Sequence, residues 1–509
     1  MTPGDERPAS LLAWLVPSIG ASVFLLGVGL ALFGKTLFSY DGDVGRHVRI
    51  GLDILTTHHI PTVDQYSHSM AGEHFVPYEW LSETLFASSW SAAGLPGVAL
   101  LTALLFATSA WLVYRTARIP GPGPVLAGAV TVLALVLQAG HLLPRPHLFT
   151  TLLAVTFLFL LESYQRSGRT GYLFVLPPLM LAWVNLHGGF LVGFILLGVY
   201  VLDAWKTRAS SPARLLALLA ASVACALATF VSPAGSEIWS HTTGYLRIDL
   251  LVDMTHEYRS PDFHGGYGRA FLLAILTGFS LLAGGRAKPS FRETLLFIGW
   301  LAAALHSARN IPLFGVLAVP WYASWIQRTC EALTADGSHG LADTIQRLDG
   351  STARTEALLR PAVVSISGLV AMAALALGPW SERYRFDETF FPAVALDRLP
   401  EDPARGHVFN EMAWGGYILL QRPDIPVFID GQTDFYGERL SRDYLRIIGG
   451  GRGWNELLDS YAIDWTLTRP GEPIVQLLDL HPDWEIRYRD PVAALSSRKR
   501  SAAASEELQ

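Results

Sequence analysis

Charged residues are scarce in this 509-residue sequence. Only 16% of the residues are Asp, Glu, Lys or Arg, against roughly 25% in a typical soluble domain, whereas 51% are hydrophobic. The mean hydropathy is +0.32. The apolar residues gather in runs without any charge, such as 11–33 and 98–114, and several approach the ~20 residues needed to cross a bilayer. The composition therefore excludes a soluble globular protein and indicates an α-helical polytopic membrane protein.

Cysteine and basic stretches are also nearly absent. Cys225 and Cys330 are the only two cysteines, so a disulfide framework is excluded and metal–thiolate chemistry is disfavoured. The net charge is -6 and no basic stripe is present, which argues against a nucleic-acid partner. The first apolar run is too long for a signal-peptide core and has no cleavage motif, so we expect a retained first span.

Eleven segments are expected to cross the membrane. They are about 10–34, 93–114, 122–140, 148–163, 171–185, 188–204, 214–231, 269–284, 293–306, 310–326 and 361–380. Alternate short loops, together with Arg214 at a span boundary, carry ten Lys and Arg residues, whereas the intervening short loops carry only Arg145 and Arg309. By the positive-inside rule, the N-terminus is cytoplasmic and residues 381–509 lie outside the cytoplasmic membrane.

The histidines follow the same division. Of the fifteen in the chain, only His339 falls in a predicted cytoplasmic loop, and the other fourteen are expected outside or at the outer membrane edge. Histidine is the side chain best suited to proton transfer near neutral pH. The chemistry is therefore expected at the outer face.

The first outer loop, 35–92, opens with two closely spaced acids, Asp41 and Asp43. Asp43 can begin a helix with an apolar face (Val44, Val48, Leu52, Leu55) and a polar face (Arg46, Arg49, Asp53). The simplest interpretation is an amphipathic helix lying at the membrane interface. An isolated Asp-x-Asp pair is usually a solvated turn, but its position directly after a span favours a functional role.

Three tight outer turns place polar groups at one membrane depth. They contain Arg145 and His147, Asn185 and His187, and Arg309. Ionisable groups at such depth usually face a protein-lined cavity, although snorkelling of the arginines to lipid headgroups is the alternative. Carboxylates suit a general base or a divalent cation, and Arg and His suit a phosphate. A lipid-linked phosphate donor fits this combination; an ion-coupled transporter would place its charges nearer the midplane.

The segment Asp43–Leu55 resembles the first-loop motif of GT-C glycosyltransferases, such as protein mannosyltransferases and lipid A aminoarabinose transferases. The stretches Asp41–His47, Arg145–Thr150, Trp183–Gly188 and Phe428–Gly431 resemble, more closely, the motifs of a bacterial branch of that superfamily. The resemblance implies inverting transfer of a sugar from a polyprenyl phosphate to an extracytoplasmic acceptor. It makes Asp43 the base, with Asp41 assisting or sharing a divalent cation (Mg or Mn) with it.

The lysine that these families carry in a second motif is absent here. We therefore assign binding of the donor phosphate or sugar to residues of the outer loops and turns. The assigned residues are Arg145, His147, His187, Arg309, His47, Glu79 and Asn185.

Residues 381–509 are predicted to form an α/β domain outside the membrane. Strands are expected at 407–409, 426–429, 465–468, 484–488 and 493–496, with helices at 414–421, 438–448, 454–461 and 474–480. Trp414 lies in a segment with a faint resemblance to an acceptor motif of oligosaccharyltransferases. Asp430 and Asp434 follow an expected strand end, where loops often carry binding residues; a turn that caps the next helix is the alternative.

The sequence thus predicts a membrane domain, 1–380, that includes the first outer loop, and an outer domain, 381–509. The leading hypothesis is a cell-envelope glycosyltransferase whose partners are a polyprenyl-phosphate donor, membrane lipid and an extracytoplasmic acceptor. Two alternatives remain: a non-catalytic membrane protein that binds a partner through its α/β domain, and a lipid-linked glycan transporter or polymerase. The loop 327–360 is expected to be a solvated amphipathic segment on the cytoplasmic side.

The orientation can be tested by cysteine labelling in a chain carrying Cys225→Ala and Cys330→Ala. We expect a membrane-impermeant maleimide to label Ser501→Cys in spheroplasts, because the C-terminal domain is predicted to lie outside. The matched variant Ser167→Cys, in a predicted cytoplasmic loop, should be labelled only after lysis. The opposite labelling pattern would invert the predicted topology.

Overall fold

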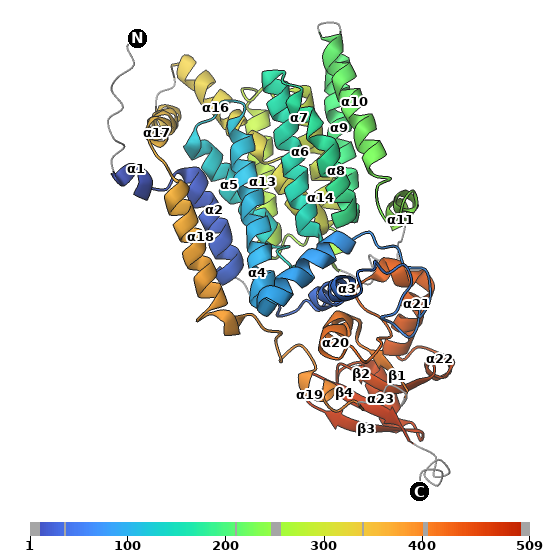
Figure 1. Ribbon diagram of the computed structural model, residues 1–509. Helices are drawn as coiled ribbons and strands as arrows, with labels where there is room; N and C mark the ends of the chain where they lie inside the picture. The colour runs from blue at the N-terminus through green and yellow to red at the C-terminus, as the bar shows by residue number, and fades with distance from the viewer. Residues whose placement is uncertain are drawn as a thin grey trace. The chain divides into compact units, whose positions relative to one another are not determined.

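The computed structural model describes residues 11–34, 37–208, 211–245, 256–337, 340–400 and 406–499. The chain divides into two compact units (Figure 1). The helical unit comprises Met1–Lys35, Pro96–Gly235 and Val252–Ser381, and the mixed unit comprises Thr36–Leu95, Ser236–Leu251 and Glu382–Gln509. This division differs from the predicted boundary, because the first loop groups with the C-terminal residues and not with the membrane helices.

Apolar helices make up the helical unit. Its principal helices are α1 (Leu11–Leu15), α2 (Ile19–Gly29), the part of α4 (Trp80–Arg118) from Pro96 onward, α5 (Pro124–Ala139), α6 (His147–Ser167), α7 (Gly171–Phe174), α8 (Leu176–Leu186), α9 (Leu191–Lys206), α10 (Pro212–Ala228), α13 (Gly266–Ala283), α14 (Phe291–His306), α15 (Ile311–Leu317), α16 (Pro320–Ala335), α17 (Leu341–Glu356) and α18 (Ala362–Leu377). Short turns follow α2 (η1, Leu30–Gly34) and precede α9 (η2, Gly188–Phe190), and η3 (His256–Tyr258) and η4 (Ala308–Asn310) lie on either side of α14 in sequence. In Figure 1, α18 runs beside α2, with which it is in contact.

Among the residues that the structure describes, five helical segments are long and apolar enough to cross a membrane. They are Ala13–Gly34, Trp80–Arg118, His147–Ser167, Gly188–Lys206 and Gly266–Ala283. Four shorter apolar helical segments, such as Pro124–Ala139 and Ala362–Leu377, accompany them. Each of the eleven segments expected from hydropathy coincides with one or more helices, and the predicted helical architecture is confirmed; the number of spans remains a prediction.

The segment expected to be solvated at 327–360 is instead anchored to other helices. Asp349 of α17 is buried, and its carboxylate accepts hydrogen bonds from the Gly123 and Val125 amides at 2.6 and 2.8 Å. These amides lie at the N-terminus of α5, where the helix leaves donors unpaired and its dipole favours an anion. Glu356 likewise accepts a hydrogen bond from the Ile19 amide, at the start of α2.

A four-stranded sheet forms the C-terminal part of the mixed unit. Its strands are β1 (His407–Asn410), β2 (Ile463–Thr468), β3 (Trp484–Arg489) and β4 (Ala494–Arg498), in the order β1-β2-β4-β3. The β1–β2 pair is parallel and the others are antiparallel. The accompanying helices are α19 (Ala393–Leu396), α20 (Gly415–Gln421), α21 (Thr433–Ile448), α22 (Trp454–Ser460) and α23 (Pro473–Leu480), so the predicted α/β character is confirmed.

The prediction of a strand at 426–429 was wrong. Only Val427 forms an isolated bridge, with Ser67 of the first loop. The next backbone groups bond to the side chain of Asn410, which accepts from the Phe428 amide at 2.7 Å and donates to the Ile429 carbonyl at 2.8 Å. A side chain therefore takes the place of a neighbouring strand here, which a hydropathy pattern does not reveal.

The helix expected at the membrane interface, α3 (Asp43–Thr57), is instead packed inside the mixed unit. Arg46, expected on its solvated face, is only 4% exposed. A Cβ atom on Gly45 would overlap the Gly416 carbonyl of α20, and one on Gly51 would overlap the Glu83 carbonyl of α4. Two glycines thus let α3 approach both helices at backbone distance.

The fold makes Asn410→Ala destabilising. Removing the buried side chain leaves the Phe428 amide and Ile429 carbonyl unsatisfied, at about 1–3 kcal/mol for each group. We expect a clear fall in the melting temperature. Thr468→Val is the control, because the Thr468 hydroxyl is buried without a hydrogen-bond partner among the described residues, and this variant should melt at or above the wild-type temperature. Equal melting temperatures for wild type and Asn410→Ala would contradict the assigned role.

Candidate functional site

The two first-loop acids lie at the start of α3 in different environments. Asp41 is buried at 3% exposure, and its carboxylate accepts a hydrogen bond from the Asp43 amide at 3.1 Å. Asp43 is the first residue of the helix and is partly exposed. The helix dipole favours a carboxylate at this position. Asp41 therefore holds the turn, and Asp43 presents the more accessible carboxylate.

Arg46, one turn further along α3, is buried among three carboxylates. Its guanidinium lies 3.5 Å from Glu83, 3.6 Å from Glu79 and 3.9 Å from Asp430. It also donates to the Gln432 side chain at 2.7 Å. Burial lowers the pKa of Arg46, but the carboxylates, Asp430 foremost, outweigh burial and raise it. The cation is thus permanently charged and joins α3, the start of α4 and the 430–432 segment.

The Asp430–Gln432 segment lies directly against Asp43. A Cβ atom on Gly431 would overlap the Asp43 carboxylate, so glycine is required for this approach. Asp430 accepts a hydrogen bond from the Gln432 amide at 2.8 Å. Burial raises the pKa of Asp430 to about 6, the positive charge of Arg46 opposes that shift, and the negative charge of Asp43 adds to it. Asp430, predicted as an acceptor-binding residue, therefore belongs to the same group as Asp43.

Three buried side chains could hold a divalent cation. Ligand atoms of His47, Glu79 and Glu83 all lie within 4.8 Å of one another. The predicted pair, Asp41 and Asp43, does not form such a group among the described residues. An imidazole with two carboxylates suits a borderline cation such as zinc better than magnesium. Glu83 was missed by the sequence analysis, although it lies four residues after Glu79 and thus at the spacing of one helical face.

A second polar group surrounds Asp434 at the start of α21. His241 of α11 (Glu237–Tyr245) lies 3.1 Å from its carboxylate, and the Tyr78 hydroxyl also bonds to it. Burial raises the pKa of Asp434, but the hydrogen bond and charge of His241 outweigh burial and lower it overall. His241 was anticipated only as one of the outer histidines.

Trp414, the third residue predicted to contact an acceptor, lies in the core. Its side chain is fully buried, its indole N–H donates to the Phe390 carbonyl at 2.9 Å, and the Arg469 guanidinium lies 5.5 Å from its ring centroid. These contacts give Trp414 a packing role.

Five of the seven residues assigned to donor binding belong to the helical unit, where they form two groups, whereas His47 and Glu79 belong to the mixed unit. In the first, Glu257 lies 3.6 Å from both His141 and Arg309, and His147 hydrogen-bonds to the His141 carbonyl at 3.0 Å. Arg309 also donates to the Tyr258 hydroxyl. Arg145 lies between His141 and His147 in sequence, in the turn before α6. Glu257 was missed because no motif surrounds it in the sequence.

The second group centres on His187. Its Nδ1 accepts from the Gly189 amide at 2.9 Å and lies 2.9 Å from the Thr150 hydroxyl, which accepts from the Trp183 indole at 2.9 Å. His187 thereby presents Nε2 as the protonated ring nitrogen. Asn185 donates to the Leu181 and Val231 carbonyls at 2.8 and 3.0 Å, which ties α8 to the end of α10.

Comparison with known proteins confirms the predicted GT-C fold. No family model and no curated protein matches the sequence. The structure resembles AglB, the oligosaccharyltransferase of Archaeoglobus fulgidus solved with an inhibitory peptide and a dolichol-phosphate (TM-score 0.54, 11% identity, 88% of this chain and 69% of that chain). A complex of the same archaeal enzyme with zinc and sulfate matches at TM-score 0.51, with 13% identity over 89% of this chain and 68% of that chain.

A bacterial enzyme has the same fold. ArnT from Cupriavidus metallidurans, bound to undecaprenyl phosphate, matches at TM-score 0.51 and 14% identity, over 94% of this chain and 97% of that chain. At these identities the likeness establishes the fold, and the chemistry has to be argued from the residues of this chain.

The ion-pair geometry predicts that Arg46→Met destabilises the mixed unit. Removing one partner of a buried ion pair costs roughly 3–5 kcal/mol, because the remaining charge stays buried and unpaired. Burial raises the pKa of Asp430 from 3.8 to about 6. The contribution of this carboxyl to folding stability is therefore complete below about pH 3.8 and is lost as the pH rises through about 6. Arg46 opposes this shift, so its removal raises the pKa of Asp430 further and makes ionisation of this carboxyl more destabilising. The melting temperature of Arg46→Met should therefore lie further below that of the wild-type protein at pH 8 than at pH 5.

Arg49→Met is the matched control, because Arg49 pairs with Asp53 at 3.2 Å on a partly exposed face. Such a pair contributes only about 0.3–0.5 kcal/mol. A defect of Arg46→Met that is no larger than that of Arg49→Met, or that is independent of pH, would show that the three carboxylates do not depend on Arg46.

Proposed function

We propose that this chain is a membrane glycosyltransferase that moves a sugar from a polyprenyl-phosphate donor to an acceptor outside the cytoplasmic membrane. The observation that carries the proposal is Asp43, a partly exposed carboxylate on the first turn of α3 that Asp41 and the 430–432 segment hold in place. The fold shared with AglB and ArnT, solved with dolichol-phosphate and undecaprenyl phosphate, supports the class of donor.

In the proposed reaction Asp43 is the general base. Its carboxylate takes the proton of the acceptor hydroxyl while the hydroxyl oxygen attacks the anomeric carbon from the face opposite the phosphate. The bond between the anomeric carbon and the phosphate oxygen breaks, and its electron pair leaves with the polyprenyl phosphate. The sugar is therefore transferred with inversion.

The neighbours of Asp43 have supporting roles in this proposal. Asp41 fixes the backbone amide of Asp43. Arg46 pairs with the two glutamates and Asp430, which leaves Asp43 as the more accessible carboxylate of the group. Arg145 and Arg309 of the helical unit are proposed to bind the donor phosphate, because guanidinium groups pair with phosphate oxygens bidentately.

A divalent cation fits the donor atoms of His47, Glu79 and Glu83. The zinc complex of an enzyme with this fold is consistent with such a site. When bound, the cation would supply positive charge that stabilises an anionic oxygen. Because the Arg46 guanidinium already lies within 3.6 Å of both glutamates, the cation would share these ligands with Arg46.

Asp43→Asn tests the proposal directly. The amide keeps the size of the side chain but cannot accept the proton, so we expect transfer to fall by about 10²–10⁴-fold, the usual contribution of a general base. Membranes containing the protein would be incubated with a panel of undecaprenyl-phosphate-linked sugars, and release of undecaprenyl phosphate would be measured.

The control is Glu73→Gln, which neutralises an exposed acid of the same loop and should leave transfer unchanged. Asp43→Asn must insert into membranes and melt like the wild-type protein. Transfer by that variant within about twofold of the wild-type rate, against the 10²–10⁴-fold loss expected on removing a base, would overturn the assignment of Asp43.

A further inference from the structure

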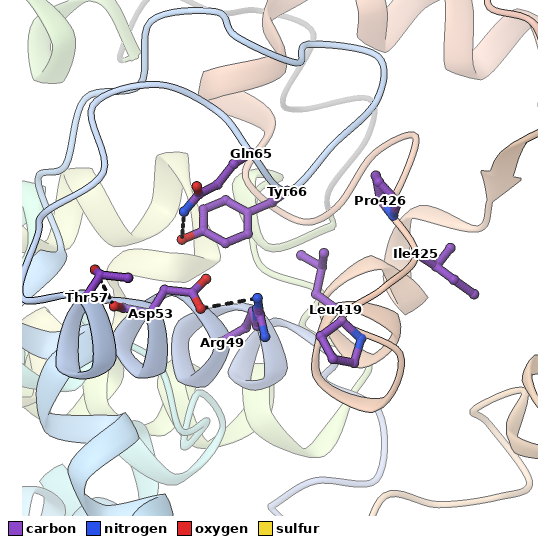
Figure 2. Close-up of a pocket in the computed structure, with 9 residues that line it drawn as sticks. Arg49, Asp53, Thr57, Gln65, Tyr66, Leu419, Ile425 and Pro426 are labelled. Carbon is purple, nitrogen blue, oxygen red and sulfur yellow. Dashed lines mark hydrogen bonds and ion pairs between the residues drawn. The ribbon is translucent and has the colours of Figure 1, made fainter. Parts of the chain in front are cut away.

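The mixed unit has a pocket that the reaction described above does not use. It lies between the C-terminal half of α3, the first-loop residues Gln65 and Tyr66, and the end of α20 with the segment that follows it (Figure 2). Its volume is about 200 Å³. All of the residues that line this pocket belong to the mixed unit.

One wall of the pocket is polar and internally bonded. The Arg49 guanidinium lies 3.2 Å from the Asp53 carboxylate, with 30% and 20% of the two side chains exposed. The buried Tyr66 hydroxyl bonds to Asp53, and the Gln65 amide donates to that hydroxyl at 3.2 Å. Figure 2 shows the Arg49, Asp53, Gln65 and Tyr66 side chains on the same side of the pocket. This wall therefore offers both donors and acceptors in a fixed arrangement.

The opposite wall is apolar. Leu419 of α20, with Pro423, Ile425 and Pro426, lines it. The last two also line a second cavity of about 120 Å³, which His407 and Trp465 border. The two cavities therefore share Ile425 and Pro426 as lining residues.

The charge of the pocket selects among ligands. Arg49 and Asp53 neutralise each other, so the wall has no net charge, and the carboxylate would repel a phosphate. The polar groups here are side chains rather than the free backbone edge that binds extended peptides. A compact neutral ligand with hydroxyl groups on its edge and an apolar face matches one polar and one apolar wall. A sugar ring has this division, and two adjoining cavities fit more than one ring.

We propose that this pocket binds a neutral sugar unit of the acceptor, with the second cavity receiving the next unit. The proposal rests on the proposed glycosyltransferase function and names its acceptor class as a saccharide. Arg49 and Asp53 follow Asp43 by six and ten residues on the same helix, roughly 9 and 15 Å along its axis. The pocket is thus a subsite at a distance from the reacting hydroxyl, and its residues position the acceptor without taking part in proton transfer.

The experiment measures sugar binding to the full chain in lipid nanodiscs, which avoid competition from glycoside detergents. Saturation-transfer NMR would compare three classes of probe: neutral methyl glycosides of several hexoses, an anionic hexose 1-phosphate and neutral N-acetyl amino acid methylamides. We expect transfer to at least one methyl glycoside, less to the phosphate and none to the peptide analogues.

Two variants locate the binding. Leu419→Trp fills the pocket, and Gln65→Ala removes an exposed hydrogen-bond donor. Each variant should weaken glycoside binding by about tenfold, the effect of losing one or two hydrogen bonds or the space for the ligand. Leu480→Trp makes the same change at a site that is 84% exposed, and it should bind like the wild-type protein.

Asp43→Asn separates this proposal from the proposed function. It should abolish transfer and keep glycoside binding, whereas Leu419→Trp should raise the KM for a saccharide acceptor with little change in kcat. If Asp43→Asn remains fully active but glycosides still bind at the pocket, only the assigned base is wrong. Absence of glycoside binding, a preference for the phosphate or the peptide analogues, or equal binding by Leu419→Trp would overturn the pocket assignment.

Discussion

The mixed unit depends on one buried cation. Arg46 faces Asp430, Glu79 and Glu83 within 3.9 Å, and the four groups come from three separate parts of the chain. Carboxylates cannot be buried together without a positive partner, because each unpaired charge costs several kcal/mol. The single cation does not neutralise three anions completely, and burial raises the pKa of Asp430 to about 6 although Arg46 opposes that shift. The same ion pairs that join α3 to the 430–432 segment thus hold the surroundings of Asp43 in one arrangement.

Helix α3 contributes residues both to the surroundings of the proposed base and to the proposed sugar pocket. Its first turn presents Asp43 beside Gly431, where only a glycine leaves room for the carboxylate. Its later turns carry Arg49 and Asp53, which pair with each other and leave a neutral pocket wall. Charge is therefore concentrated where a proton would be transferred and balanced where a neutral sugar would bind. The cationic residues suited to a phosphate, Arg145 and Arg309, belong to the helical unit.

Much of the fold could be predicted from the sequence, because long apolar runs permit few structures other than helices. Four of the five strands expected in the C-terminal part also formed. The predictions that failed have a common cause, which is a polar side chain that bonds to groups far away in the sequence. Asn410 replaces a strand partner for Phe428 and Ile429, and the carboxylates from α4 and the 430 segment turn Arg46 inward. Amphipathic spacing places Arg46 on a polar face, but it does not distinguish water from a buried carboxylate as the partner of that face. Asp43 and Asp430 could be found from local motifs, whereas Glu83 and Glu257 were missed because their partners lie elsewhere in the sequence.

The central claim is that the Asp43 carboxylate faces the anomeric carbon of a lipid-linked sugar. A cryo-EM map of the protein with an uncleaved undecaprenyl-phosphate sugar would test it most directly. The account predicts that the anomeric carbon faces Asp43, with space for an acceptor oxygen within about 3 Å of the carboxylate, and that the phosphate lies on the far side of the sugar. A phosphate nearest to Asp43, or a sugar beyond reach of that carboxylate, would contradict it.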